Sequence, residues 1–87
     1  MTVKLLLLDE DEQLLMVQGR DPLTRISNRR DNGQMFQLVQ PLADAVGPSI
    51  VQILSSGRPV ALGMVRAGGF SIQNNLTHSL SLQIQSR

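Results

Sequence analysis

Short apolar runs separated by polar stretches open the chain. Residues 3–8 form one apolar run, four consecutive acids follow at residues 9–12, and residues 14–17 form a second run. This pattern predicts two strands around an acidic turn, because short apolar runs bounded by turn residues are typical of strands. The alternative is one helix over about residues 5–18, since several leucines there roughly keep a helical spacing. We favour the hairpin.

Residues 19–33 differ in composition, with four arginines, two aspartates, Pro22 and the pair Asn32-Gly33. Residues of these types are common in turns, so the stretch predicts a linker or long loop. The chain then divides into two parts. Residues 1–33 are expected to form an N-terminal hairpin or helix with a basic linker, and residues 34–87 a small helix-plus-meander domain.

The apolar residues between positions 34 and 46 are spaced to line one side of a helix. Pro41 divides this stretch, because proline lacks an amide donor and is tolerated only in the first turn of a helix. We therefore expect an irregular turn as far as Gln40 and a short helix from Pro41. Gly47 and Pro48 end this helix, since glycine adopts the left-handed cap conformation and proline cannot continue it.

Two further segments, residues 49–54 and 60–65, are rich in β-branched and other apolar residues. A loop of about five residues that contains Gly57 separates them, and strands joined in this way form a β-hairpin. Gly63 lies inside the second strand, where it marks a bulge or a close backbone approach.

The C-terminal part continues the strand pattern. Residues 67–69 predict a turn, residues 70–73 a third strand and residues 74–75 another turn. Residues 79–85 alternate strictly between apolar and polar side chains, which predicts a last strand. The inward residues of that strand are Leu80, Leu82 and Ile84.

Length and composition place these elements in one small domain. The chain has 87 residues and a mass of 9.6 kDa, with 41% apolar and 17% charged residues. This balance indicates a globular protein rather than a disordered tail. The sequence has two Phe and neither Trp nor Tyr, and a chain of this size buries only about 60–65% of its unfolded surface. We therefore expect marginal stability or support from a partner subunit.

Charge, cysteine content and targeting signals exclude several classes of protein. Eight Lys and Arg against seven Asp and Glu give a net charge of +1, which argues against tight nucleic-acid binding. The absence of cysteine excludes a disulfide framework and a thiolate zinc site. We find no signal peptide and no stretch of about 20 apolar residues. We expect no membrane association, with the cytoplasm as the default location.

Few residues are candidates for catalysis or metal binding. His78 is the only histidine, and we consider it as a general base, but without a nearby acid it is more typical of an exposed polar residue. The acids at residues 9–12 point in different directions, which predicts a solvated turn rather than a Ca²⁺ or Mg²⁺ site. The arginines of residues 20–30 predict a solvated linker rather than a phosphate clamp. We expect no metal and no cofactor.

One stretch of the sequence contains three segments in order: residues 42–53 (LADAVGPSIVQI), 57–65 (GRPVALGMV) and 68–75 (GGFSIQNN). This series resembles the opening of the trypsin-like domain of HtrA/Deg-type serine proteases. The resemblance implies a two-barrel endopeptidase in which a histidine after the Asn pair is the general base. Here Leu76 follows the pair, His78 comes two residues later and no Gly-x-Ser-Gly turn is present. The resemblance therefore implies a non-catalytic barrel fragment.

Residues 21–30 (DPLTRISNRR) resemble the opening motif of GGDEF diguanylate cyclase domains, Asp-x-Leu-Thr-Gly-Leu-x-Asn-Arg-Arg. This second resemblance implies a nucleotide-binding domain in which carboxylates hold magnesium against a triphosphate. Arg66 and Gly68 stand where that family would place its two metal-binding acids. A degenerate GGDEF-like nucleotide-binding domain is therefore our second choice.

The patterns predict a mostly β (α+β) fold, a small partial barrel or meander with one short helix. So few strands leave exposed edges, and unpaired edges recruit further strands. We therefore expect a homo-oligomer, or a protein or peptide partner bound by strand addition. The sequence supplies no complete catalytic triad and no set of metal-binding acids, so we expect no enzymatic activity; a serine endopeptidase fragment is a further alternative. The expected interaction strands carry Ile50, Val51, Ile53, Leu80, Leu82 and Ile84.

Overall fold

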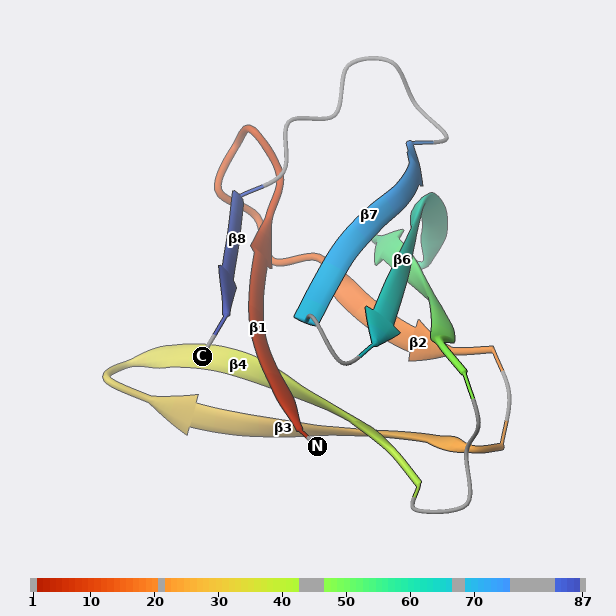
Figure 1. Ribbon diagram of the computed structural model, residues 1–87. Helices are drawn as coiled ribbons and strands as arrows, with labels where there is room; N and C mark the ends of the chain where they lie inside the picture. Colours follow the sequence, from red (N-terminus) through yellow and green to blue (C-terminus); the bar gives the residue numbers. More distant parts are fainter. Residues whose placement is uncertain (1, 21, 43–46, 67–68, 76–82, 87) are drawn as a thin grey trace.

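The computed structural model describes residues 2–20, 22–42, 47–66, 69–75 and 83–86, and every regular element among them is a β-strand (Figure 1). The strands are β1 (Val3–Leu8), β2 (Met16–Gly19), β3 (Thr24–Asp31), β4 (Gln34–Pro41), β5 (Ser49–Ser55), β6 (Arg58–Arg66), β7 (Gly69–Asn75) and β8 (Gln83–Ser86). The mostly β fold is therefore confirmed.

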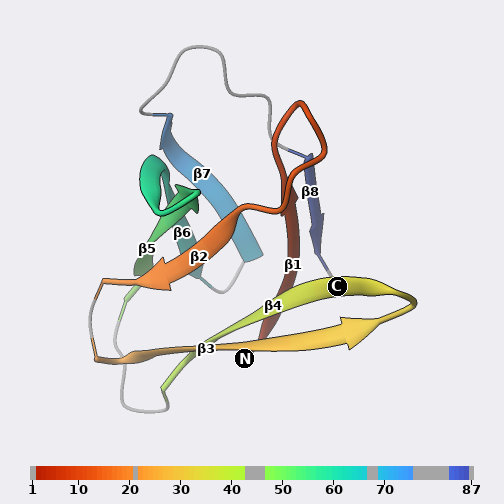
Figure 2. The same cartoon turned by 180° about the vertical axis from the view of Figure 1, so that it is seen from behind.

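The strands form two four-stranded antiparallel sheets, in the orders β3-β4-β1-β8 and β2-β5-β6-β7. The long β3–β4 hairpin lies across one end of the molecule (bottom in Figures 1 and 2), with β1 and β8 side by side above it and β5, β6 and β7 on the other side. The sheets do not close into a barrel, since no ladder joins β2 to β3 or β7 to β8 in the described part of the chain. Consecutive pairing of β5, β6 and β7 confirms a meander.

β1 and β2 follow one another in sequence but belong to different sheets. Leu8 and Leu14 form a single bridge, and the Leu15 N–H donates to the Leu7 C=O over 2.9 Å. The two strands predicted around the acidic turn are confirmed, and the helix alternative is wrong. The strands separate after this bridge instead of continuing as a hairpin, because β2 pairs with β5 from Met16 onward.

Both sheets turn an apolar face toward a shared core. The largest fully buried apolar side chains are Leu5, Leu7, Leu15, Val39, Val51, Ile53 and Val65. Ile26, Phe70 and Ile72 pack against this cluster while remaining partly exposed. Full burial of one such side chain contributes on the order of 1.5–3 kcal/mol, so aliphatic residues account for most of the stability.

Residues 24–41 form a β-hairpin, which corrects the predicted linker and the predicted irregular turn. β3 and β4 pair along their whole length, beginning with Asp31 and Gln34 beside the turn. Asn32 (φ 52°) and Gly33 (φ 77°) both adopt the left-handed conformation. A two-residue type I′ turn requires this conformation at both positions. The expected domain boundary after Gly33 falls within this turn.

No helix is seen in the described residues where the sequence predicts a short one from Pro41. β4 ends at Pro41, and residues 43–46 of the expected helix lie outside the described residues. The helical spacing was coincidental, because Met35, Gln37 and Val39 alternate along one face of a strand. Proline is tolerated at the last position of β4, where the ladder ends.

β5 and β6 form the predicted hairpin, with a shorter turn than expected. Ser55 pairs with Arg58, so Ser56 (φ 49°) and Gly57 (φ 81°) alone make the turn. This is a second two-residue turn with both residues in the left-handed region.

Gly63 lies opposite a bulge, since Leu62 pairs with Asn74 and Gly63 with Ile72, which leaves Gln73 of β7 as the extra residue. A Cβ atom at Gly63 would lie 2.5 Å from Cζ of Phe70 and 3.2 Å from Cγ2 of Val51. The close neighbour is therefore the aromatic ring of Phe70, which covers the glycine from the adjacent strand.

β7 is the predicted third strand, and it includes Asn74 and Asn75, which corrects the turn expected there. The last predicted strand is described from Gln83 onward. β8 pairs antiparallel with β1 and places Ile84 opposite Leu7. The predicted residues outside the described part of the chain are Ala67, Gly68, His78, Leu80 and Leu82.

Candidate functional site

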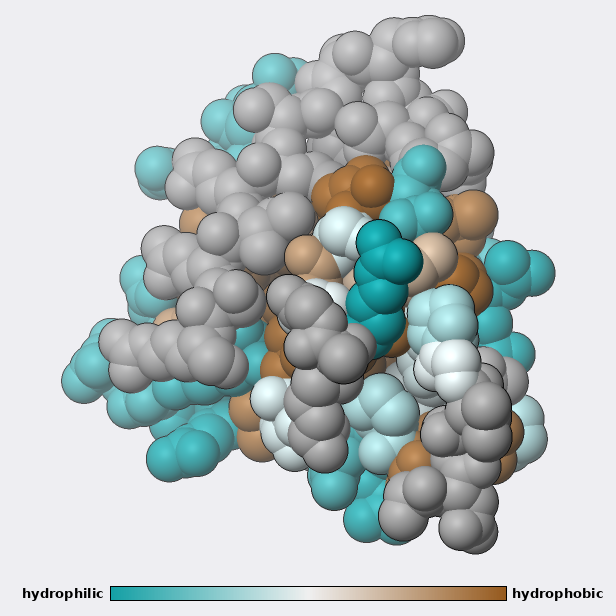
Figure 3. Space-filling view, in the orientation of Figure 1, coloured by the Kyte–Doolittle hydropathy of each residue, from teal (hydrophilic) through white to brown (hydrophobic). Residues whose placement is uncertain are grey.

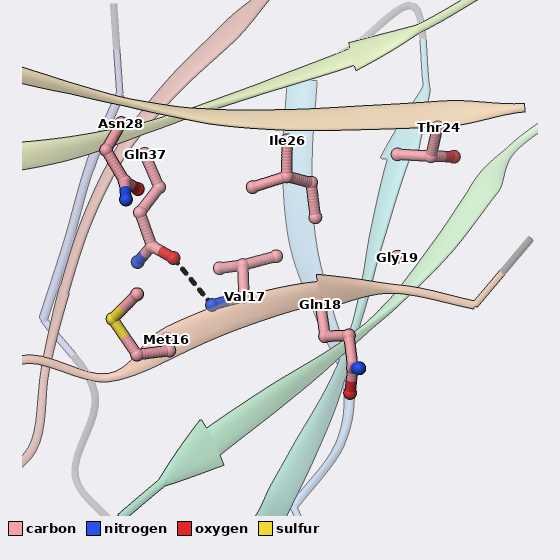
Figure 4. A pocket seen from close by; sticks show the side chains of 8 residues that line it. All are labelled: Met16, Val17, Gln18, Gly19, Thr24, Ile26, Asn28 and Gln37. Carbon is pink, nitrogen blue, oxygen red and sulfur yellow. Dashed lines mark hydrogen bonds between the residues drawn. The ribbon is translucent and has the colours of Figure 1, made fainter. Parts of the chain in front are cut away.

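A buried glutamine side chain joins the two sheets. Gln37 lies on β4, is fully buried and pairs through its backbone with Leu5 of β1. Its Oε1 accepts the Val17 N–H over 2.6 Å, and its Nε2 donates to the Leu15 C=O over 2.7 Å (Figure 4). The carboxamide thus occupies the position of a peptide group beside β2, which fixes the spacing between the sheets.

A groove of about 290 Å³ lies between β2 and β3 (Figure 4). It is lined by Met16, Val17, Gln18, Gly19, Thr24, Ile26, Asn28 and Gln37. The Val17 and Ile26 side chains point toward one another across it. β2 and β3 approach each other where β2 ends, since a Cβ atom at Gly19 would lie 3.4 Å from the Thr24 carbonyl oxygen. The groove therefore narrows toward the β2–β3 connection.

In the part of the chain that the structure describes, β3 is the terminal strand of its sheet. In a two-residue hairpin the pair beside the turn is hydrogen-bonded, and hydrogen-bonded pairs then alternate along the ladder. Counting from the hydrogen-bonded pair Asp31 and Gln34, Ile26 and Asn28 fall at positions that are not hydrogen-bonded to β4. Their backbone N–H and C=O groups therefore point away from β4. The hydrogen bond of 2.7 Å from the Leu42 N–H to the Leu23 C=O agrees with this alternation of hydrogen-bonded pairs. No strand of the described chain pairs with these outward groups.

β2 presents an edge to the same groove. The Val17 N–H points away from β5, because it donates to Gln37. The N–H and C=O of one strand residue point to the same side, so the Val17 C=O also points away from β5, toward the groove. Both walls of the groove therefore offer backbone groups as well as apolar side chains.

Three large apolar side chains of the described residues are exposed, and one of them lines this groove. They are Leu14, Met16 and Leu23, with exposed fractions of 36%, 40% and 42%. Met16 lines the groove, Leu14 precedes it by two residues and Leu23 directly precedes β3. Met16 therefore adds an exposed apolar surface to the groove.

Three exposed arginines, Arg25, Arg29 and Arg30, give the β3 edge a positive charge. The acid of the strand, Asp31, is engaged by Lys4, whose Nζ lies 2.8 Å from its Oδ2. None of the three arginines forms an ion pair with another described residue. Hydrophilic side chains gather over the tip of the β3–β4 hairpin, at the lower left of Figure 3.

Of the predicted interaction residues that the structure describes, none lines this groove. β5 is an interior strand that pairs with β2 on one side and β6 on the other, so its backbone is not open to strand addition. Val51 and Ile53 are fully buried in the core, and Ile50 is half-buried. Ile84 belongs to the terminal strand β8, and the remaining predicted residues, His78, Leu80 and Leu82, lie outside the described part of the chain.

The acidic run forms a turn organised by its own first carboxylate. The Asp9 Oδ1 accepts the N–H groups of Asp11 and Gln13 at 2.8 and 2.9 Å. Among the described residues, no group of three or more His, Cys, Asp and Glu is placed to hold a metal ion.

The described residues also contain no helix with the length and apolar character needed to cross a membrane.

Sequence reasoning missed the groove residues Val17, Ile26, Asn28 and Gln37. Two signals in the sequence point to them. Asn32-Gly33 is a strong type I′ hairpin signal, and it would have placed residues 24–31 in a strand. Gln37 is a polar residue at an inward position between two apolar ones, and a buried amide of this kind needs partners.

No protein-family model matches the chain, and neither do any curated proteins or solved structures. The resemblances to HtrA/Deg proteases and to GGDEF domains therefore stay predictions. The groove and the two strand edges are the features from which a function can be proposed.

Proposed function

We propose that this protein is a non-catalytic interaction module that binds an extended segment of a partner protein by strand addition along β3. The observation that carries the proposal is the outward direction of the Ile26 and Asn28 backbone groups beside a groove that polar and apolar side chains line together. Unpaired edge groups accept a further strand, in which main-chain hydrogen bonds supply affinity and side-chain pockets supply specificity.

β3 is the best of the available edges. It has eight residues, whereas the terminal strands β2 and β8 have four each and β7 has seven. It is also the edge that borders the groove, which the exposed Met16 lines. A longer edge gives more backbone hydrogen bonds to an added strand, each contributing about 0.5–1.5 kcal/mol net.

The groove gives the bound segment a place for a side chain. An added strand continues the sheet beyond β3, so its inward side chains lie beside Ile26 and above Val17. The groove volume of about 290 Å³ is at the lower end of ligand pockets, which span about 300–1,000 Å³. The groove therefore suits one or two side chains of a segment rather than a large cofactor.

A pair of proline variants tests strand addition. Random peptides displayed on phage are selected on the wild-type protein, and an enriched peptide is titrated by calorimetry. Asn28→Pro removes an outward N–H and leaves the β3–β4 hydrogen bonds in place, so we expect at least a tenfold loss of affinity in a folded protein. Asn28→Ala keeps the N–H and should bind within about threefold of wild type.

Ser27→Pro is the matched structural control, because the Ser27 N–H points toward β4. This variant should lose stability, since it removes a ladder hydrogen bond. Unchanged affinity in Asn28→Pro, or the failure of any peptide to enrich on the wild-type protein, would contradict the proposal.

A further inference from the structure

We infer that the segment bound along β3 is acidic, with two carboxylates four residues apart and apolar residues between them. This inference rests on the proposed function and names the chemistry of the partner. It is carried by the charge of the β3 edge and by the alternation of its side chains.

Among the described residues, no ion pair compensates the positive charge of the β3 arginines. The one acid of β3, Asp31, has its Oδ2 within 2.8 Å of the Lys4 Nζ, and the side chain of Lys4 is only 13% exposed. That carboxylate is thus engaged from within the fold. Arg25, Arg29 and Arg30 remain exposed without an ion pair to any described residue. An added strand that carried acids would supply the missing partners.

Strand alternation fixes where the acids belong. Ile26 and Asn28 line the groove, so Arg25 and Arg29 lie on the opposite, outer face of β3. Residues of the added strand that lie opposite these two arginines are four positions apart and share the outer face. The positions next to them turn inward, toward Ile26 and the groove. The expected core is therefore acid, apolar, any residue, apolar, acid.

A second copy of this chain is a poor occupant of the same edge. Antiparallel pairing of two β3 strands would bring together the three arginines of each copy. Like charges opposite one another on neighbouring strands are destabilising, whereas opposite charges contribute about 0.2–1 kcal/mol for each pair. The charge of the edge thus selects a different, acidic partner.

A single-stranded nucleic acid would also satisfy the arginines, but it fits the rest of the site less well. The outward edge of β3 offers both N–H donors and C=O acceptors, and a strand backbone complements both, whereas phosphates only accept. The side chains of Val17 and Ile26, which face each other across the groove, offer apolar contact rather than charge. These features favour a polypeptide.

The test uses a labelled synthetic peptide with the core Glu-Val-Thr-Val-Glu, which reads the same in both directions. Matched peptides carry Gln or Lys in place of both Glu residues. Fluorescence anisotropy should show the Glu peptide binding about tenfold more tightly than the Gln peptide, and the Lys peptide most weakly. The preference should shrink between about 50 and 300 mM NaCl, because exposed ion pairs are screened.

Charge-reversal variants complete the test. The double variant Arg25→Glu/Arg29→Glu should prefer the Lys peptide. The control variant Arg58→Glu/Arg66→Glu makes the same charge change on two exposed arginines of β6 and should keep the wild-type preference.

The two proposals fail in different ways. If the three peptides bind the wild-type protein equally and none of them binds Asn28→Pro, the acidic partner is overturned and strand addition stands. Equal binding of the Glu peptide to Asn28→Pro and to wild type would overturn strand addition. A dT oligonucleotide that displaces the labelled Glu peptide at a lower concentration than the unlabelled Glu peptide does would assign the edge to nucleic acid and overturn the acidic segment. If no peptide binds the wild-type protein, both proposals are wrong.

Discussion

The buried carboxamide of Gln37 accepts the backbone N–H of Val17 over 2.6 Å, so a side chain of one sheet completes the strand edge of the other. The same carboxamide donates to the Leu15 C=O over 2.7 Å. Buried amides in native proteins are almost always paired in this way. The contact holds β2 at a fixed distance from β4, and it thereby sets one end of the groove.

Gln37→Met should lower the free energy of unfolding by about 2–5 kcal/mol. The substitution keeps a similar shape but leaves the Val17 N–H and the Leu15 C=O without their partner, and each buried orphan costs about 1–3 kcal/mol. Urea denaturation measures the loss. Gln40→Met, at an exposed position of the same strand, is the control and should change stability by less than about 0.5 kcal/mol. An equally small change in Gln37→Met would show that the sheets do not depend on this link.

Gly63→Ala should destabilise the protein by about 1–3 kcal/mol, because the new methyl group overlaps the ring of Phe70 and overpacks the core. The overlap is severe, with a Cβ atom 2.5 Å from Cζ of Phe70. Phe70→Leu removes that ring atom, so the alanine substitution should cost less in a Phe70→Leu background. A double-mutant cycle from thermal unfolding gives the coupling energy. Strict additivity of the two substitutions would contradict the contact.

Gly33→Ala should lower the free energy of unfolding by about 1–2 kcal/mol, because a residue with a Cβ atom is strained at a positive φ. Gly33 has a φ of 77°, and nothing lies within 4 Å of a Cβ atom built there, so the cost comes from the backbone alone. Gly33→Asn should lose less, since asparagine tolerates the left-handed conformation. Comparable losses for both variants in urea denaturation would count against a type I′ turn.

The hairpin of β5 and β6 could be predicted because its residues are apolar, β-branched and bounded by turn formers. Val51 and Ile53 repeat every second residue, and both are fully buried as that period requires. Gly63 marked the register shift between β6 and β7 for a simple reason: a strand interior gains nothing from glycine unless another group needs the space. Local pattern and tertiary packing agree in this part of the chain.

β3 and β4 escaped prediction because charged residues obscure the strand pattern of β3 and because the apolar residues of β4 also fit a helical spacing. An exposed edge strand needs charges on its outer face, so Arg25 and Arg29 made it resemble a solvated linker. In β4, Met35, Leu38 and Val39 happen to fit a helical spacing as well as a strand. The groove could not be predicted, since it depends on where β2 leaves β1, and that geometry is set by the Gln37 side chain rather than by a local motif.

Amide hydrogen exchange measured residue by residue with NMR tests strand addition most directly. In the free protein the N–H groups of Ile26 and Asn28 should exchange at least about tenfold faster than those of Ser27 and Arg29, which point toward β4. Addition of the Glu-Val-Thr-Val-Glu peptide should slow the Ile26 and Asn28 amides and leave the other two unchanged. Absence of the alternation in the free protein, or unchanged exchange of Ile26 and Asn28 with saturating peptide, would contradict the account.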